Sequence, residues 1–435
     1  MSMRNRTVKR VAAMVGLALL APFLLATETR QASASECANC SGNCACPAPE
    51  PRLETAFGQS LFWQDPCGGG YRDDFMPCYE HNSGPPTWFA SAEFLPLFRD
   101  QNGSAPFQAV AIGQADPEAP AEITFFRDAV LGSSDFDTEF VPGVRALFGR
   151  ALGDWYRVEF SYMGSHSWSD VVGVQYPDYV PPTPYDPGIP PTPYDPGSGL
   201  MVSPFSNFGD PTGPSGLGPV SEASFSPILG LDYNQYAEIS FSSRLDSAEA
   251  NLRRRLCVSP GRYYQGEASC LIGVRYLKVQ EEFGYFTQSA IAANEVFVKT
   301  DNDLIGPQLG AMVQFLVHDR AWIDAEIKGA LLFSEARNTT YADLYIGEQQ
   351  IQATTRGTED STAFLGDLSV NLNYQFAPSL TVRAGYNAFW LNGVALASEN
   401  FSSNVQTLVS DRPAPVNHDG RVVYHGPSLG LVYTR

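Results

Sequence analysis

The sequence predicts an all-β protein, an antiparallel transmembrane β-barrel of about 10–12 strands with short periplasmic turns and long external loops. Segments in which polar and apolar residues alternate recur from Trp88 to the C-terminal end, as expected of strands with one polar and one apolar face. Short and long connections alternate between these segments. Beyond the N-terminal run, no apolar stretch approaches the roughly 20 residues of a membrane helix, so a closed barrel is the alternative that satisfies every backbone group in lipid.

The N-terminus is typical of an exported protein. Four basic residues precede an apolar run from Val11 to Ala26, and Ala32-Ser33-Ala34 fits a small-residue cleavage site. We interpret residues 1–34 as a signal peptide that is removed on export, with a retained N-terminal anchor as the alternative. The expected location is the bacterial outer membrane.

The exported chain is strongly acidic. The whole sequence has 28 Lys and Arg against 47 Asp and Glu, and removal of residues 1–34 leaves 23 against 46. This balance argues against nucleic-acid binding, which requires a basic footprint. The expected partners are outer-membrane lipid, the barrel-assembly machinery and, as an option, a second copy in a homo-oligomer. No cofactor is expected.

Eight cysteines precede or interrupt the strand segments. An even count in an exported chain favours disulfides, and the candidates are Cys257 with Cys270 and Cys67 with Cys78. A cluster after the cleavage site could bind a metal through thiolates, but it lacks the paired spacing of a zinc ribbon, so no metal is predicted. It comprises Cys37, Cys40, Cys44 and Cys46. We expect residues 35–86 to form a Cys-, Pro- and Gly-rich segment and residues 87–435 to form the barrel.

Ten strands are expected if residues 236–256 form one strand, and two more within 107–136 would give twelve. They lie in Trp88–Phe98, Gly143–Arg150, Trp155–Met163, Tyr236–Leu256, Ser269–Glu281, the hairpins Gly306–Phe333 and Phe364–Trp390, and Val422–Thr434. The apolar phase switches at Asp246, which indicates either a bulge in one long strand or a tight turn.

Five long connections are expected on the external side. They are residues 99–141, 169–235, 283–306, 334–362 and 392–420. The second contains a direct repeat, VPPTPYDPG followed by IPPTPYDPG, whose prolines exclude a central strand or a helix. We interpret it as a stiff external spacer within a long Pro-rich loop, with a ligand motif for a partner as the alternative.

If the apolar faces meet lipid, the charged side chains opposite them must face the lumen. An Arg or Lys turned toward the bilayer midplane would be destabilising by about 2–4 kcal/mol. These charges could bias ion passage, or they could pair across a packed lumen. The residues concerned are Arg145, Arg157, Glu159, Asp324, Glu326, Lys328 and Arg383.

No motif indicates an enzyme. The sequence contains neither H-E-x-x-H nor G-x-S-x-G, and the nearest candidate for a nucleophilic pair is His166 with Ser165 or Ser167. No catalytic residue is predicted.

Six segments in a fixed order resemble the β-barrel porin family BBP7 of planctomycetes over roughly residues 88–435. They are TWFASAEFLPLF, VPGVRALFGRALGDWYRVEFSYMG, FSSRLDSAEANLRRRL, GVRYLKVQEEFGYF, NDLIGPQLGAMV and GPSLGLVYTR. The resemblance implies an outer-membrane barrel and supplies no catalytic residues. The chain departs from many outer-membrane barrels in ending Tyr433-Thr434-Arg435 rather than in Phe, a residue read by the insertion machinery.

The function expected from these observations is a porin-like passive diffusion channel for small solutes. The alternative is a non-conducting structural or adhesive surface protein that displays Pro-rich loops. A soluble exported β-sandwich that binds a ligand is a third reading, and the alternation of short and long connections argues against it.

Overall fold

The computed structural model describes most of the chain from Trp88 onward. The described residues are 88–100, 108–115, 124–137, 139–153, 155–175, 200–210, 217–221, 224–256, 266–346, 349–409 and 413–435. The predicted signal peptide, the N-terminal segment and the Pro-rich repeat lie outside them. In the described parts of the chain, no helix is long and apolar enough to cross a membrane.

Ten of the described strands pair in a closed antiparallel ring. The ring order is β1–β5–β6–β9–β10–β11–β12–β13–β14–β15, and β15 pairs with β1. The members are β1 (Trp88–Phe94), β5 (Val144–Leu152), β6 (Tyr156–Gln175), β9 (Asn234–Leu256), β10 (Gly266–Ser289), β11 (Ala293–His318), β12 (Ala321–Ile346), β13 (Gln349–Ala377), β14 (Leu380–Val394) and β15 (Gly420–Thr434). The predicted barrel is therefore confirmed with ten strands.

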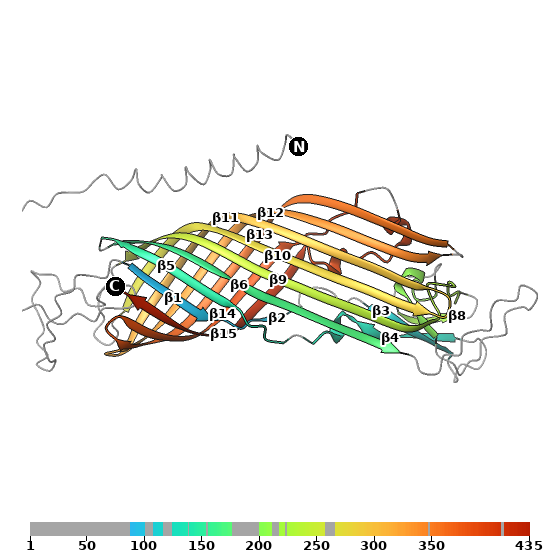
Figure 1. Ribbon diagram of the computed structural model, residues 1–435, viewed down its shortest axis with the longest axis horizontal. Coiled ribbons are helices and arrows are strands. Elements are labelled where there is room, and N and C mark those ends of the chain that lie inside the picture. Colours follow the sequence, from blue (N-terminus) through green and yellow to red (C-terminus); the bar gives the residue numbers. More distant parts are fainter. Residues whose placement is uncertain are drawn as a thin grey trace, which may run out of the picture.

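The strands expected within 107–136 form but do not join the ring. They are β3 (Gln108–Ala115) and β4 (Thr124–Gly132), which pair with each other. Their other partners are the short strands β7 (Leu200–Val202), which pairs with β3, and β8 (Gly218–Ser221), which pairs with β4. The twelve-stranded alternative was wrong because β3 and β4 are not members of the ring: they connect to it through β7, which pairs with β9 at Met201 and Asn234, at the far end of the molecule (Figure 1).

Two of the expected long loops are strands. Only residues 290–292 separate β10 from β11, and only residues 347–348 separate β12 from β13. We call the end of the ring that carries Trp88 and Thr434 its lower end and the opposite end its upper end. The predictions of loops at 283–306 and 334–362 were wrong, because both segments form the upper halves of hairpins. The strands of these hairpins pair without a break in register through most of their length. The barrel is consequently tall: by their bounds, β6 and β9 to β13 are longer than β1, β5, β14 and β15, and the long strands extend beyond the short ones (Figure 1).

The two halves of the long strands have opposite polarity. In the lower half of β11, the outward side chains Leu309 and Phe315 are 64 % and 46 % exposed, while Gln308 and Gln314 point inward and are buried. In its upper half, Val296 and Val298 are fully buried. A strand that is apolar outside below and apolar inside above crosses from an apolar to an aqueous surrounding.

The same inversion explains the phase switch at Asp246. The pairing of β9 with β10 is continuous from Leu256 to Tyr236, so β9 contains neither the predicted tight turn nor a bulge on this side. A register shift does occur opposite this point, but it lies in β6 between Met163 and His166. The apolar phase of β9 changes because its outward face leaves the apolar band.

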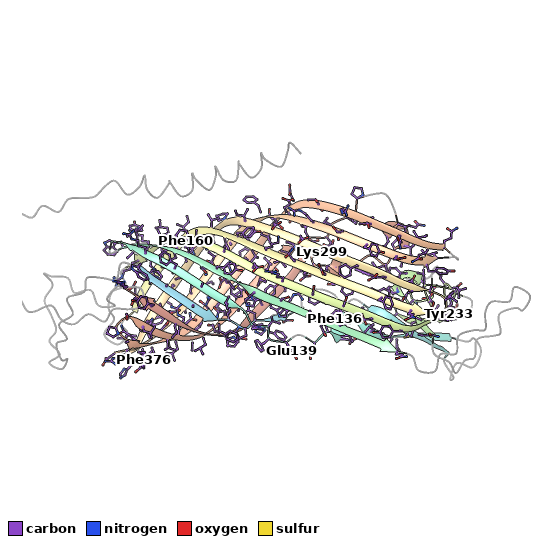
Figure 2. All side chains as sticks on the ribbon, viewed as in Figure 1. Phe136, Glu139, Phe160, Tyr233, Lys299 and Phe376 are labelled. Carbon is purple, nitrogen blue, oxygen red and sulfur yellow. The ribbon has the colours of Figure 1, made fainter. Side chains whose placement is uncertain are left out.

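The apolar band surrounds the lower barrel. Figure 2 shows Phe160 and Phe376 projecting from the wall near the end of the ring at which β1 begins and β15 ends. These side chains are 54 % and 68 % exposed. Lys299 projects from the upper part. No described element packs over the band, which a soluble barrel would have to bury.

Candidate functional site

The interior of the lower barrel is filled by charged side chains, which we call the ionic layer. They come from eight of the ten ring strands and pair with one another. The layer consists of Glu93, Arg145, Arg157, Glu159, Glu249, Arg253, Arg275, Asp324, Glu326, Lys328, Asp367 and Arg383.

Three contacts of the ionic layer cross the lumen between β9–β10 and β12–β13. Arg253 Nη2 donates to Glu326 Oε1 at 2.5 Å, Arg275 Nη1 to Asp367 Oδ2 at 2.9 Å, and Lys328 Nζ lies 3.3 Å from Glu249 Oε2. Each pair joins strands that are three places apart in the ring. Such contacts span the interior of the barrel rather than run along its wall.

The other side of the lumen is closed around Glu93 and Arg383. Arg383 Nη1 donates to Glu93 Oε1 at 3.2 Å and its Nη2 lies 3.5 Å from Asp324 Oδ2, while Arg145 also pairs with Glu93. Asn371 and Asn373 donate to the two oxygens of Asp324 at 2.7 and 2.5 Å. These amides complete the hydrogen bonding of the buried Asp324 carboxylate, whose cationic partner Arg383 lies at the longer distance.

The seven charged residues expected to face the lumen all lie in the ionic layer. Four have residue exposures below 10 %, and the side chains of Arg145, Glu326 and Lys328 are 15 %, 15 % and 11 % exposed. Their pairing partners Glu93, Glu249, Arg253, Arg275 and Asp367 were not predicted as site residues. Alternation already put Glu249, Arg253 and Asp367 on the polar face, whereas only closure of the ring reveals which strands face each other.

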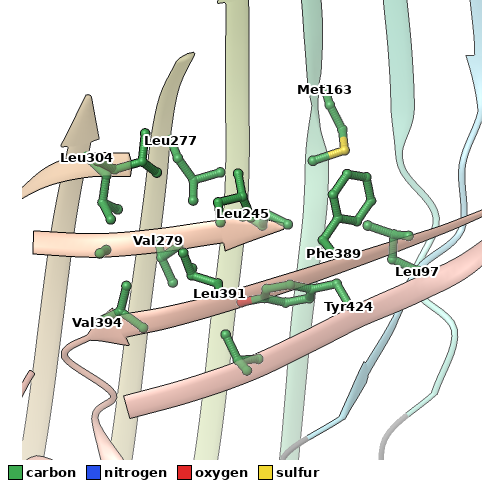
Figure 3. Close-up of a cluster of buried hydrophobic side chains, with 14 of the residues drawn as sticks. Leu97, Met163, Leu245, Leu277, Val279, Leu304, Phe389, Leu391, Val394 and Tyr424 are labelled. Carbon is green, nitrogen blue, oxygen red and sulfur yellow. The ribbon is translucent and has the colours of Figure 1, made fainter. Parts of the chain in front are cut away.

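An apolar layer lies directly above the ionic layer. On β10 the next inward positions are Leu277 and Val279, and on β14 Phe389 and Leu391 follow above the buried Asn387; all four apolar side chains are buried. Figure 3 shows these side chains converging with Leu97 and others from the surrounding strands. The lumen therefore passes from a paired ionic layer into a buried apolar cluster.

The connection from β14 to β15 folds into the upper barrel. We call its described residues, 395–409 and 413–419, the inner loop; it contains the helix α2 (Val405–Leu408). Asn302 donates to the Ala395 carbonyl at 2.8 Å and accepts from its N–H at 2.8 Å, so the side chain substitutes for a strand partner. Glu281 accepts from the Ala397 N–H at 3.1 Å and pairs with Arg99.

The inner loop leaves the barrel over β13. Asn338 donates to the Pro415 carbonyl at 3.3 Å, and a Cβ added at Gly357 would lie 2.0 Å from the Ala414 carbonyl oxygen. Only glycine at position 357 allows this close crossing.

Aromatic side chains seal the upper barrel where the inner loop meets a second segment. Phe401 contacts Phe205, Phe283 and Tyr285, with ring centroids 5.5–6.0 Å apart. Phe205 lies in the short helix η2 (Pro204–Ser206) of the segment between β7 and β9. Asp232 holds this segment by accepting from the Ser203 and Ile228 N–H groups at 2.7 Å, and burial raises the pKa of Asp232 to about 6.

The nearest candidate for a catalytic pair does not assemble. His166 is buried, stacks on Trp168 and has its Nε2 2.8 Å from the Leu95 carbonyl oxygen, whereas Ser165 and Ser167 point outward and are exposed. No group of three or more His, Cys, Asp or Glu able to hold a metal ion occurs among the described residues. The early Cys37–Cys46 cluster is outside those residues.

The predicted disulfides find no support in the described residues. Cys270 lies half-buried in β10 as a free thiol. Its predicted partner Cys257 lies outside the described residues, as do Cys67 and Cys78, so these pairings stay predictions.

A closed antiparallel ring with a bare apolar band and a charged interior defines a transmembrane β-barrel. Residues 235–434 match the model of a family described as "Putative beta barrel porin-7 (BBP7)". The resemblance predicted from the sequence is thus confirmed over β9–β15, the C-terminal part of the ring.

Solved outer-membrane barrels align with the chain at low similarity. The outer membrane protease OmpT from Escherichia coli is 9 % identical, with 81 % of this chain and 97 % of that chain covered and a TM-score of 0.39. The translocator domain of the autotransporter NalP from Neisseria meningitidis is 8 % identical, with 81 % and 89 % covered and a TM-score of 0.29. A FadL homologue from Pseudomonas aeruginosa is 8 % identical, with 80 % and 90 % covered and a TM-score of 0.20. No curated protein matches the sequence.

Proposed function

We propose that this chain is a bacterial outer-membrane β-barrel whose lumen is closed by its own side chains and whose tall upper part displays loops outside the cell. The observation that carries the proposal is the set of ion pairs that cross the lumen, such as Arg253 with Glu326 and Arg275 with Asp367. An open pore of this strand number would have to separate these pairs, because a ring of about ten strands is narrow enough for side chains to fill.

Several observations support the location. The apolar band suits lipid hydrocarbon, the family match names barrel porins, and the sequence begins with a predicted export signal. Outer-membrane lipid and the barrel-assembly machinery are the partners that follow from this proposal. The chain's role is then structural: it anchors the upper barrel, the hairpin β3–β4 and the Pro-rich segment at the cell surface.

A porin-like passive channel for small solutes is the second candidate. The description of the matching family favours it. It requires a state in which the ionic layer, the apolar layer and the inner loop separate, because each fills a different level of the lumen. The charges on the wall would then face the permeating ions.

Planar-bilayer recording distinguishes the two candidates. We expect the intact chain, folded into the bilayer, to give no discrete conductance steps at ±100 mV. Separating a buried, hydrogen-bonded ion pair is strongly unfavourable, so the pairs should keep the lumen closed. The same preparation is run on a detergent gel with and without heating. A change of migration on heating shows that the barrel has folded, so that an absence of conductance does not result from failed insertion. Reproducible steps of one size from folded protein would favour the passive channel and contradict the closed lumen.

A further inference from the structure

The outward charges of the barrel are distributed unequally between the two borders of the apolar band. Above the band, four outward cations have a carboxylate partner on the same outer face, whereas Arg356 and Arg421 are exposed and have no ion pair among the described residues. The pairs are Arg244 with Asp246 at 3.0 Å, Lys278 with Asp303 at 3.6 Å, Lys299 with Glu282 at 2.6 Å and Arg337 with Glu335 at 2.9 Å. Asp301 and Asp343 add negative charge on the same outer face, so this part of the outer surface is not basic.

The lower border carries exposed arginines without such partners. Arg150 ends β5, Arg254 lies near the end of β9, Arg320 lies in the turn between β11 and β12, and Arg435 follows β15. None of them takes part in an ion pair among the described residues, and Asp319 is the only exposed acidic side chain described at this end. We call these four residues the terminal rim.

Aromatic side chains continue the terminal rim around half of the ring. Trp88 pairs in register with Arg150, and its ring contacts Tyr433 at 5.7 Å between centroids. The guanidinium of Arg254 lies 5.9 Å from the centre of the Tyr156 ring. All of these side chains lie on the outward phase of their strands, directly below the apolar band. Aromatic rings at this depth mark the border between hydrocarbon and headgroups.

We propose that the terminal rim binds the anionic phosphate headgroups of phospholipids in the membrane leaflet at this end of the barrel. Unpaired guanidinium groups complement phosphate by charge and by hydrogen-bond geometry. Their position below the apolar band coincides with the level of the headgroups of any lipid that covers the band. The three longest connections of the ring, β1–β5, β6–β9 and β14–β15, all lie at the opposite end, so this end is assigned to the periplasm and the leaflet is the periplasmic one. This inference rests on the proposed membrane location.

The overall charge of the chain predicts the opposite, namely repulsion from anionic lipid. The chain has a net charge of −19, so anionic lipid would repel it unless a local basic surface dominates. Attraction to anionic lipid that disappears when arginines of the terminal rim are replaced would therefore report the terminal rim.

The test compares folding from urea into vesicles of phosphatidylcholine with folding into vesicles that also contain phosphatidylglycerol, at low salt. The folded fraction is read from migration in an unheated gel. We expect the anionic lipid to raise the folding equilibrium constant of the intact chain about tenfold, and the gain to disappear in R150Q/R254Q and in high salt. The matched control R244Q/R337Q removes two outward cations from the upper border and should keep the gain.

Each other outcome has a distinct meaning. Equal folding of the intact chain in both kinds of vesicle, or a full gain in R150Q/R254Q, overturns the inference while leaving the membrane barrel intact. Failure of the intact chain to fold into either kind of vesicle overturns the proposed function and the inference with it. R150K/R254K, which retains the charges, separates loss of charge from loss of folding and should keep most of the gain.

Discussion

Replacing Arg275 by methionine should lower the free energy of unfolding by about 3–5 kcal/mol, because it leaves buried carboxylates without their partner. Arg275 is 1 % exposed, donates to Asp367 at 2.9 Å and to Ser247 at 3.1 Å, and lies 3.5 Å from Glu249. After the substitution, Lys328 alone would face both carboxylates. Urea unfolding in lipid vesicles, followed by gel migration, measures the loss.

The control is Arg244→Met, which removes a pair on the outer surface. Arg244 is 59 % exposed and its bond to Asp246 is solvent-accessible, so the expected loss is below about 1 kcal/mol. A second variant, R275M/D367L, removes both charges of the pair and should recover part of the stability. Equal small losses for R275M and R244M would mean that water fills the lumen and screens the ionic layer.

Placing a lysine at Ile327 should lower the free energy of unfolding in lipid by about 2–4 kcal/mol. Ile327 is 59 % exposed at the middle of the outward apolar face of β12, and its strand neighbours Ala311 and Leu368 are also apolar. A charge at this position would have to be placed in hydrocarbon. The same urea titration in vesicles measures the effect.

Tyr341→Lys provides the matched control on the same strand and the same face. Tyr341 lies above the apolar band and beside Asp343, whose side chain would accept a lysine as a neighbour. Its expected effect is within about 1 kcal/mol. If I327K were as mild as Y341K, the outward face of lower β12 would be in contact with water.

The sequence was sufficient to predict the lower barrel. The hairpin within Gly306–Phe333 forms as β11 and β12, with the turn at the expected place, because Leu309 to Val317 and Ile323 to Phe333 keep one apolar phase. The seven charges opposite that phase followed from the same alternation. Their partners did not, because Arg253 and Glu326 lie far apart in sequence and meet only through closure of the ring.

The upper barrel was missed for a physical reason. A strand with Lys299, Asp301 and Asp303 outside and apolar residues inside does not match a lipid-facing pattern, so this stretch reads as a polar loop. Its inner face is covered by the inner loop, which is irregular and bound by single side chains such as Asn302 and Glu281. Residues 395–419 have no periodic pattern from which those contacts could be predicted.

Photo-crosslinking in vesicles tests most directly whether the lower outward face touches lipid. Benzoylphenylalanine would replace Phe315, which is outward in the band, Tyr341, which is outward above it, or Trp322, which is buried inside. We predict lipid adducts, detected by mass spectrometry, at position 315 alone. Adducts of similar yield at 315 and 341, or a protein–protein crosslink in place of lipid at 315, would contradict a barrel whose apolar band lies in the membrane.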